Sequence, residues 1–132
     1  MINNICNKSV LIVDDDAGLL RALGKVLASE GCKVTCATSV QDAIDILARQ
    51  KAPMDLVITD LWMPVVTGLT GLYIIRTMFP EVPVIVLTAF GSPDFKSECL
   101  RLGAEAFLEK PLDTPQLLSA VEGALVSQKA GA

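Results

Sequence analysis

Short, unbroken runs of Val, Ile and Leu recur along the chain, and each run ends at or just before a polar residue. Three such runs occupy residues 10–13, 56–58 and 84–87, and a fourth, shorter apolar run is Phe107-Leu108. Strands that are buried on both faces have this composition, and such strands belong to parallel sheets covered by helices. A weaker run at Lys33–Ala37 completes a set of five predicted strands.

Segments with a helical period separate these strands. The first repeats apolar side chains every three or four residues, at Leu19, Leu20, Leu23, Val26 and Leu27. Gly31 predicts the end of this helix, and Asp16 predicts the cap at its beginning. Thr38 and Gln41 predict a capping box for the second helix. The spacing predicts three more helices, over residues 69–78, 93–102 and 115–126.

The strict alternation of strand and helix predicts an α/β fold. We expect a doubly wound, flavodoxin-like parallel sheet of five strands in the order 2-1-3-4-5, with five helices on its two faces. The chain is expected to form a single domain over residues 1–132, with a core at about 8–126 and a loose tail at 127–132. Ligands of such sheets bind at the carboxyl ends of the strands, so the polar residues there should line one cleft.

Composition narrows the classes of function. The formal net charge is −4, and the basic residues are spread along the chain, which argues against direct nucleic-acid binding. No apolar run approaches the roughly 18 residues of a membrane span. The first eight residues lack the features of a signal peptide, so we expect a cytoplasmic protein. The chain has no histidine, which excludes His-based catalysis and a phosphohistidine on this chain.

The cysteines do not indicate a metal site. They lie at positions 6, 32, 36 and 99, without a C-x-x-C spacing and without histidine to complete a zinc site. We therefore interpret them as structural thiols in a reducing compartment.

Carboxylates should gather at the strand ends. Asp14 and Asp15 follow the first strand, and Asp60 follows the third. These two strands are neighbours in the predicted sheet, at the point where the strand order reverses. At an effective dielectric constant of about 20, two such charges 4 Å apart repel by about 4 kcal/mol. Either a carboxyl group retains a proton or a divalent cation neutralises the charge. We favour Mg²⁺, which prefers oxygen ligands and serves phosphoryl transfer together with a carboxylate nucleophile and a lysine.

Four segments together resemble the response regulator receiver domain of two-component signalling, the CheY-like superfamily. They are V-L-I-V-D-D-D at 10–16, D-L-V-I-T-D-L-W-M-P at 55–64, V-I-V-L-T-A at 84–89 and G-A-E-A-F-L-E-K-P at 103–111. The resemblance covers nearly the whole chain. It implies that Asp60 is the phosphoacceptor. It also implies that Mg²⁺ is bound by Asp15, Asp60 and the backbone carbonyl of Trp62, and by Asp14 mainly through water.

The same resemblance assigns the other site residues. Thr88 would donate a hydrogen bond to the phosphoryl group, and Lys110 would pair with that group. Phe107 occupies the position of an aromatic switch that turns inward when Thr88 moves toward the phosphate. The resemblance also implies a cis peptide bond between Lys110 and Pro111.

Partners follow from the resemblance as well. A sensor histidine kinase or a phosphotransfer protein would donate the phosphoryl group, and a downstream protein or an output domain would respond. A homodimer could form through the fourth helix, fifth strand and fifth helix. The sequence leaves open whether the domain acts alone or within a longer regulator or hybrid kinase.

Two alternatives compete with this interpretation. An apolar strand before Asp14-Asp15-Asp16 also resembles the start of haloacid-dehalogenase-like phosphatases, in which Asp14 would be the nucleophile. Those enzymes need a later acidic pair, but the only acids after Lys110 are Asp113 and Glu122. A flavodoxin-like FMN binder fits the fold less well, because acidic residues after the first strand would repel the phosphate.

Overall fold

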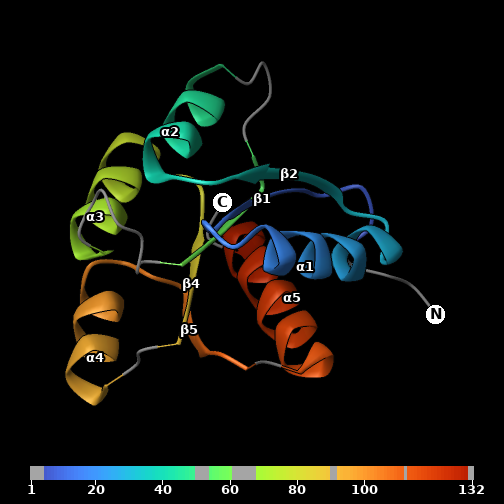
Figure 1. The fold of residues 1–132 in the computed structure, drawn as a ribbon. Helices are drawn as coiled ribbons and strands as arrows, with labels where there is room; N and C mark the ends of the chain where they lie inside the picture. Colours follow the sequence, from blue (N-terminus) through green and yellow to red (C-terminus); the bar gives the residue numbers. More distant parts are fainter. Residues whose placement is uncertain (1–4, 50–53, 61–67, 90–91, 112, 131–132) are drawn as a thin grey trace.

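Strand and helix alternate along the chain in the computed structural model, which describes all residues except 1–4, 50–53, 61–67, 90–91, 112 and 131–132 (Figure 1). The elements are β1 (Ser9–Val13), α1 (Ala17–Ser29), β2 (Lys33–Ala37), α2 (Val40–Arg49), β3 (Leu56–Thr59), α3 (Gly68–Met78), β4 (Val84–Thr88), α4 (Pro93–Arg101), β5 (Ala106–Glu109) and α5 (Thr114–Ala130).

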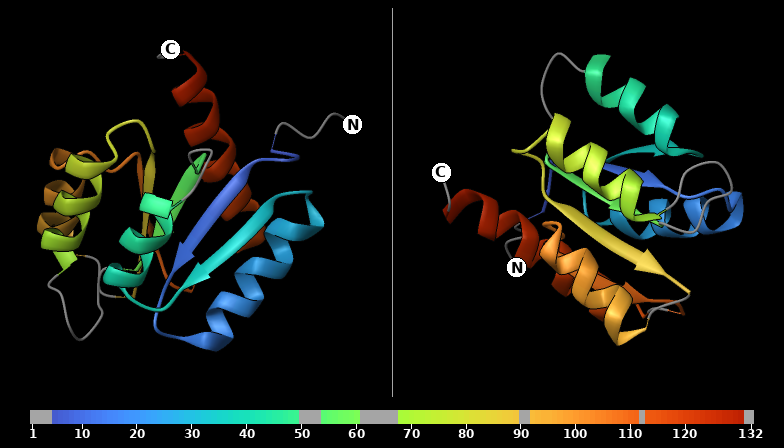
Figure 2. Two further views of the ribbon diagram at one scale, coloured as in Figure 1. Left: turned by 90° about the horizontal axis from the view of Figure 1, so that it is seen from above. Right: turned by 90° about the vertical axis from the view of Figure 1, so that its left-hand side faces the viewer.

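The strands form one parallel sheet in the order β2-β1-β3-β4-β5, which confirms the predicted topology. Helices α1 and α5 cover one face, and α2, α3 and α4 cover the other (Figures 1 and 2). This doubly wound arrangement gives the sheet two buried faces, which explains why β3 and β4 consist almost entirely of branched apolar residues.

Alternate residues of each strand enter two separate cores. In β1, Val10 and Ile12 pack in the core under α1 and α5, whereas Leu11 and Val13 pack in the core under α2, α3 and α4. Successive side chains of a strand point to opposite faces, so the same alternation fixes the face for each residue at the strand ends.

The boundaries of α1 are those expected from its capping residues. The Asp16 side chain accepts a hydrogen bond from the backbone N–H of Leu19 at 3.2 Å. Gly31 follows the helix with a φ angle of +90°. A side chain there would also meet Cys6, whose Sγ lies 2.7 Å from the position of an added Cβ. Glycine is therefore required at this turn for both reasons.

Two predicted boundaries are corrected. Ser39, not Thr38, caps α2, because the Ser39 hydroxyl accepts from the backbone N–H of Asp42 at 3.0 Å. Val40, Ala43 and Leu47 of this helix are buried in the core. Helix α5 continues to Ala130, where a loose tail was expected from residue 127. Residues 127–130 contain neither glycine nor proline, so nothing in their sequence stops the helix.

Two further predictions concern single features. The peptide bond between Lys110 and Pro111 is cis, as expected. In the described part of the chain, no helix is long and apolar enough to cross a membrane.

Candidate functional site

Three of the predicted site residues meet at the carboxyl edge of the sheet. The Nζ atom of Lys110 lies 2.9 Å from Oδ2 of Asp14 and 2.8 Å from Oδ2 of Asp60. Both carboxylates are buried, with residue exposures of 2% for Asp14 and 6% for Asp60. We refer to Asp14, Asp60 and Lys110 as the carboxylate–lysine cluster.

Backbone pairing brings the cluster together. Val13 pairs with Thr59 in the sheet, so the acids that follow these residues emerge side by side from β1 and β3. The N–H of Asp60 donates to the Val13 carbonyl at 2.9 Å, which continues the pairing one step beyond the strand. On the far side, the N–H of Lys110 donates to the carbonyl of Thr88 at 2.9 Å. The site is therefore an extension of the sheet itself.

The surroundings shift the pKa values of Asp14 and Lys110. Burial raises the pKa of Asp14 above its ordinary value, although hydrogen bonds from Lys110 and from the backbone N–H of Asp16 act in the opposite direction. Burial lowers the pKa of Lys110, but its hydrogen bonds to Asp60 and Asp14 outweigh this effect and raise it. The lysine is thus held in its charged form between the two acids.

This geometry changes the interpretation of the charge at the site. From the sequence, we expected a proton or a divalent cation to offset the repulsion between the carboxylates. We expected Lys110 to pair with the phosphoryl group. In the structure, the Lys110 ammonium itself lies between the two acids. One positive charge against two buried negative charges, with the exposed Asp15 beside them, leaves the site with an excess of negative charge.

The predicted metal ligands are placed only in part. Asp14 and Asp60 lie together, and the side chain of Asp15 is exposed at the same edge. Trp62 falls outside the described residues. Among those residues, no three acidic, cysteine or histidine side chains are arranged to hold a metal ion. The complete ligand set therefore stays a prediction.

The two predicted switch residues belong to the other face of the sheet. Thr88 is fully buried at the end of β4 and follows the alternation of Val84 and Val86, which pack under α2, α3 and α4. Phe107 packs against the same core and meets Phe95 of α4 edge-on, with ring centroids 5.9 Å apart and an interplanar angle of 73°. Phe107 is thus in direct contact with α4.

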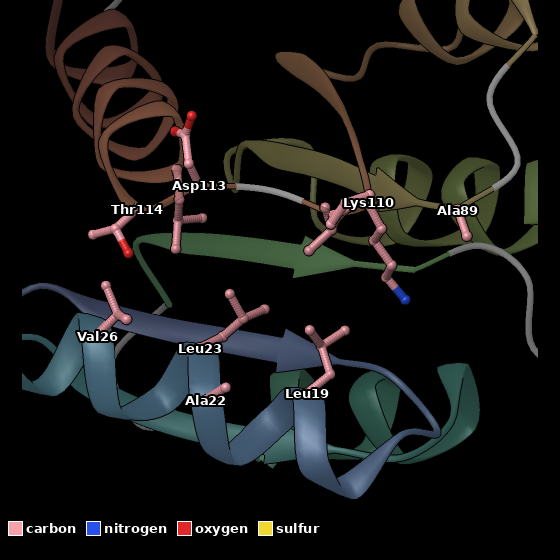
Figure 3. Close-up of a pocket in the computed structure, with 11 residues that line it drawn as sticks. Leu19, Ala22, Leu23, Val26, Ala89, Lys110, Asp113 and Thr114 are labelled. Carbon is pink, nitrogen blue, oxygen red and sulfur yellow. The ribbon is translucent and has the colours of Figure 1, made fainter.

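A pocket of about 520 Å³ opens beside the cluster, between α1 and the start of α5. Its α1 wall is apolar and includes Leu19, Leu23 and Val26, whereas Asp113 and Thr114 line the opposite side (Figure 3). Lys110 borders this pocket, with its side chain extended toward the end of β3 (Figure 3). The Lys110 side chain is 21% exposed, so it contacts both the buried acids and the solvent.

Sequence reasoning missed two polar contacts that shape the site. Oδ1 of Asp14 accepts from the N–H of Asp16 at 2.9 Å, which fixes the turn after β1. The buried hydroxyl of Thr59 donates to the backbone carbonyl of Asp60 at 3.0 Å. A signal for the second was available in the sequence, because Thr59 is the one polar residue within the run Leu56–Thr59.

Comparison with known proteins agrees with this geometry. A family model described as "Response regulator receiver domain" matches residues 10–122. The chain is 33% identical over 119 residues to the chemotaxis protein CheY of Treponema pallidum, a match that covers 88% of this chain and 81% of that protein.

The chain also resembles part of a longer protein and a solved structure. It is 41% identical over 116 residues to the transcriptional regulatory protein GlrR of Escherichia coli (strain K12), which covers 88% of this chain but 26% of that protein. The chain thus spans about a quarter of the length of this relative. A crystal structure of a response regulator receiver domain protein from Clostridium thermocellum superposes with a TM-score of 0.87 at 29% identity, covering 95% of this chain and 99% of that one.

Proposed function

The chain belongs to the response regulator receiver domain family, and from this premise we propose that Asp60 accepts a phosphoryl group from a partner's phosphohistidine in a Mg²⁺-dependent transfer. The observation that supports this most directly is the carboxylate–lysine cluster. Its Asp60 carboxylate lies at the carboxyl end of β3, within 2.8 Å of the lysine ammonium. The family match does not favour the phosphatase alternative with Asp14 as nucleophile.

The residues of the chain supply a nucleophile and positive charge. An oxygen of the Asp60 carboxylate attacks phosphorus, an O–P bond forms, the N–P bond of the donor breaks, and its electron pair returns to the partner's imidazole. Lys110 is held at the site by Asp14 and offers its ammonium group to the phosphoryl oxygens. The domain would thus catalyse only its own phosphorylation and dephosphorylation.

The types of donor at the site suit Mg²⁺, which would require the described acidic side chains to move together around it. Asp14, Asp15 and Asp60 would hold it with the carbonyl of Trp62, because carboxylate and carbonyl oxygens suit this hard cation and the cluster carries excess negative charge. Bound Mg²⁺ would neutralise charge on the phosphoryl oxygens. Trp62 is the only tryptophan in the chain, so its fluorescence is expected to respond when Mg²⁺ binds.

We propose that the conformational change caused by phosphorylation spreads through residues on the face of the sheet opposite the cluster. Thr88 would move toward the phosphoryl group, and Phe107 would turn with it and change its contact with Phe95 on α4. The resulting change in protein–protein contacts would reach an output domain, a separate target or a second copy through α4, β5 and α5. A sensor histidine kinase or phosphotransfer protein would supply the phosphoryl group.

The test is labelling with acetyl phosphate, followed by mass spectrometry of the intact protein and its peptides. We expect one phosphoryl group on Asp60 in the presence of Mg²⁺, and none in Asp60→Asn or after chelation. Asp42→Asn is the matched control, because Asp42 is an exposed acid on α2. Undiminished labelling of Asp60→Asn would contradict the proposal, and a phosphoryl group mapped to Asp14 would favour the phosphatase alternative.

A further inference from the structure

A single hydroxyl lies within an otherwise apolar row across the sheet. Val13 pairs with Thr59, Thr59 pairs with Val86, and Val86 pairs with Phe107, so these four side chains form a row on one face. Thr59 is fully buried in the middle of this row. Valine has the same shape as threonine and would fill the position without a polar group, so the hydroxyl calls for an explanation.

The Thr59 hydroxyl makes a contact that ends at the proposed phosphoacceptor. It donates to the backbone carbonyl of Asp60 at 3.0 Å. Burying a hydroxyl costs free energy unless the hydroxyl is hydrogen-bonded. The hydroxyl of Thr59 donates its hydrogen bond to Asp60, the proposed phosphoacceptor. The contact joins the interior of the sheet to the end of β3.

Together with its neighbours, this contact restrains Asp60 on three sides. The N–H of Asp60 donates to Val13 at 2.9 Å, its carbonyl accepts from Thr59, and its carboxylate accepts from Lys110 at 2.8 Å. The first two contacts restrain the backbone on either side of the Asp60 Cα. They therefore limit the directions in which its Cβ and carboxylate can leave the sheet.

We propose that Thr59 is a positioning residue for phosphoryl acceptance, because its buried hydroxyl holds the Asp60 carbonyl and thereby aims the Asp60 carboxylate. The inference rests on the proposed function of Asp60. Thr59 does not touch the phosphoryl group. Its effect is exerted through Asp60, and small displacements of a nucleophile reduce rates strongly.

Three substitutions separate the hydroxyl from the rest of the side chain. Thr59→Val keeps the shape and removes the hydroxyl, Thr59→Ser keeps the hydroxyl and removes the methyl group, and Thr59→Ala removes both. We expect Thr59→Val and Thr59→Ala to reduce the maximal rate of labelling by acetyl phosphate about threefold to tenfold, the size of one lost hydrogen bond. Thr59→Ser should stay within about twofold of wild type although its melting temperature falls, because it leaves a cavity.

The comparison of rate with stability decides the outcome. A merely structural role would make the rate follow the melting temperature, so that Thr59→Ser would lose as much as Thr59→Ala. That result, or a wild-type rate in Thr59→Val, would overturn the inference. If Thr59→Val does not fold, the Ser and Ala variants still differ only in the hydroxyl.

A second measurement needs no phosphorylation. The ¹H–¹⁵N signal of the Lys110 ammonium group reports its contact with the carboxylates, and it should change in Thr59→Val but persist in Thr59→Ser. If wild type is not labelled at Asp60, the proposed function fails, and this signal still shows whether the hydroxyl places the carboxylate. An unchanged signal in Thr59→Val would refute the positioning role alone.

Discussion

Replacing Lys110 with methionine should destabilise the fold much more than removing a surface cation. Methionine keeps an unbranched side chain of similar length but removes the ammonium group. The two buried carboxylates of Asp14 and Asp60 would then face each other without the charge that now lies between them. The substitution therefore isolates the electrostatic contribution of one lysine.

The expected loss follows from the contacts of the ammonium group. Lys110 makes two short hydrogen bonds to charged acceptors, and such bonds contribute about 1.5–3 kcal/mol each. Removing one partner of a buried ion pair costs about 3–5 kcal/mol. The Lys110 side chain is 21% exposed, so water replaces part of the interaction. We therefore expect a loss of about 3 kcal/mol in the free energy of unfolding, a large fraction of the 5–15 kcal/mol typical of a domain.

The loss in the free energy of unfolding should depend on pH, and the pKa shifts predict the direction of this dependence. The pKa of Lys110 is raised, so its contribution is present below the unfolded pKa and is lost as pH rises through the folded value. Without the lysine, the pKa of Asp14, already raised above 3.8 by burial, rises further. The folded variant then binds a proton more readily than the unfolded chain. Its deficit should shrink as pH falls through this raised pKa.

Urea denaturation of wild type and Lys110→Met from neutral pH to about pH 4 measures this difference. Arg101→Met is the matched control. Its 2.6 Å ion pair with Glu98 is shorter than either contact of Lys110, yet both of its side chains are exposed. Exposed pairs contribute little, so this control should not differ measurably from wild type. Equal losses in the two variants, or a Lys110→Met deficit that grows on acidification, would refute the reasoning.

Further predictions concern backbone, packing and thiols. Gly31→Ala should lower the free energy of unfolding by about 1–2 kcal/mol because of its positive φ angle, whereas Gly123→Ala, with no atom within 4 Å of the new Cβ, should raise it by about 0.5–1 kcal/mol. A double-mutant cycle of Phe95→Leu and Phe107→Leu should give a coupling of about 0.5–1.5 kcal/mol, and additive losses would contradict the edge-on contact. Burial raises the pKa of Cys99 to about 11, so at pH 8 a thiol reagent should modify the two exposed cysteines first and Cys99 only on unfolding.

The sheet and the convergence of the site residues could be predicted from the sequence. Runs such as Leu56–Thr59 are typical of strands in a sheet covered on both faces, and alternation with helices predicts a parallel, doubly wound sheet, for which 2-1-3-4-5 is a common order with five strands. Polar residues at the ends of parallel strands then meet without any knowledge of side-chain positions. The meeting of Asp14 and Asp60 followed from topology alone.

The individual side-chain contacts of the site could not be predicted, because they join residues that are far apart in the sequence. Lys110 and Asp14 are 96 positions apart, and whether the ammonium reaches the acid depends on how the ends of β5 and β1 lie in space. Similarly, Thr38 and Ser39 offer the same capping chemistry. The structure selects Ser39, whose hydroxyl accepts from the N–H of Asp42, and the residue types alone do not distinguish the two.

The alternation of side chains along the strands also bears on how such a domain can evolve. By the alternation of side chains, the carboxylate–lysine cluster lies on the same face as the residues that pack under α1 and α5, whereas Thr88 and Phe107 lie on the face covered by α2, α3 and α4. Substitutions in the two cores therefore meet different packing constraints, whereas Thr59 links one face to the acid on the other through its hydrogen bond to Asp60. A one-residue insertion within a strand has the opposite effect, because it exchanges the faces of every later residue of that strand. Changes in length are thus tolerated in the loops and not within the strands.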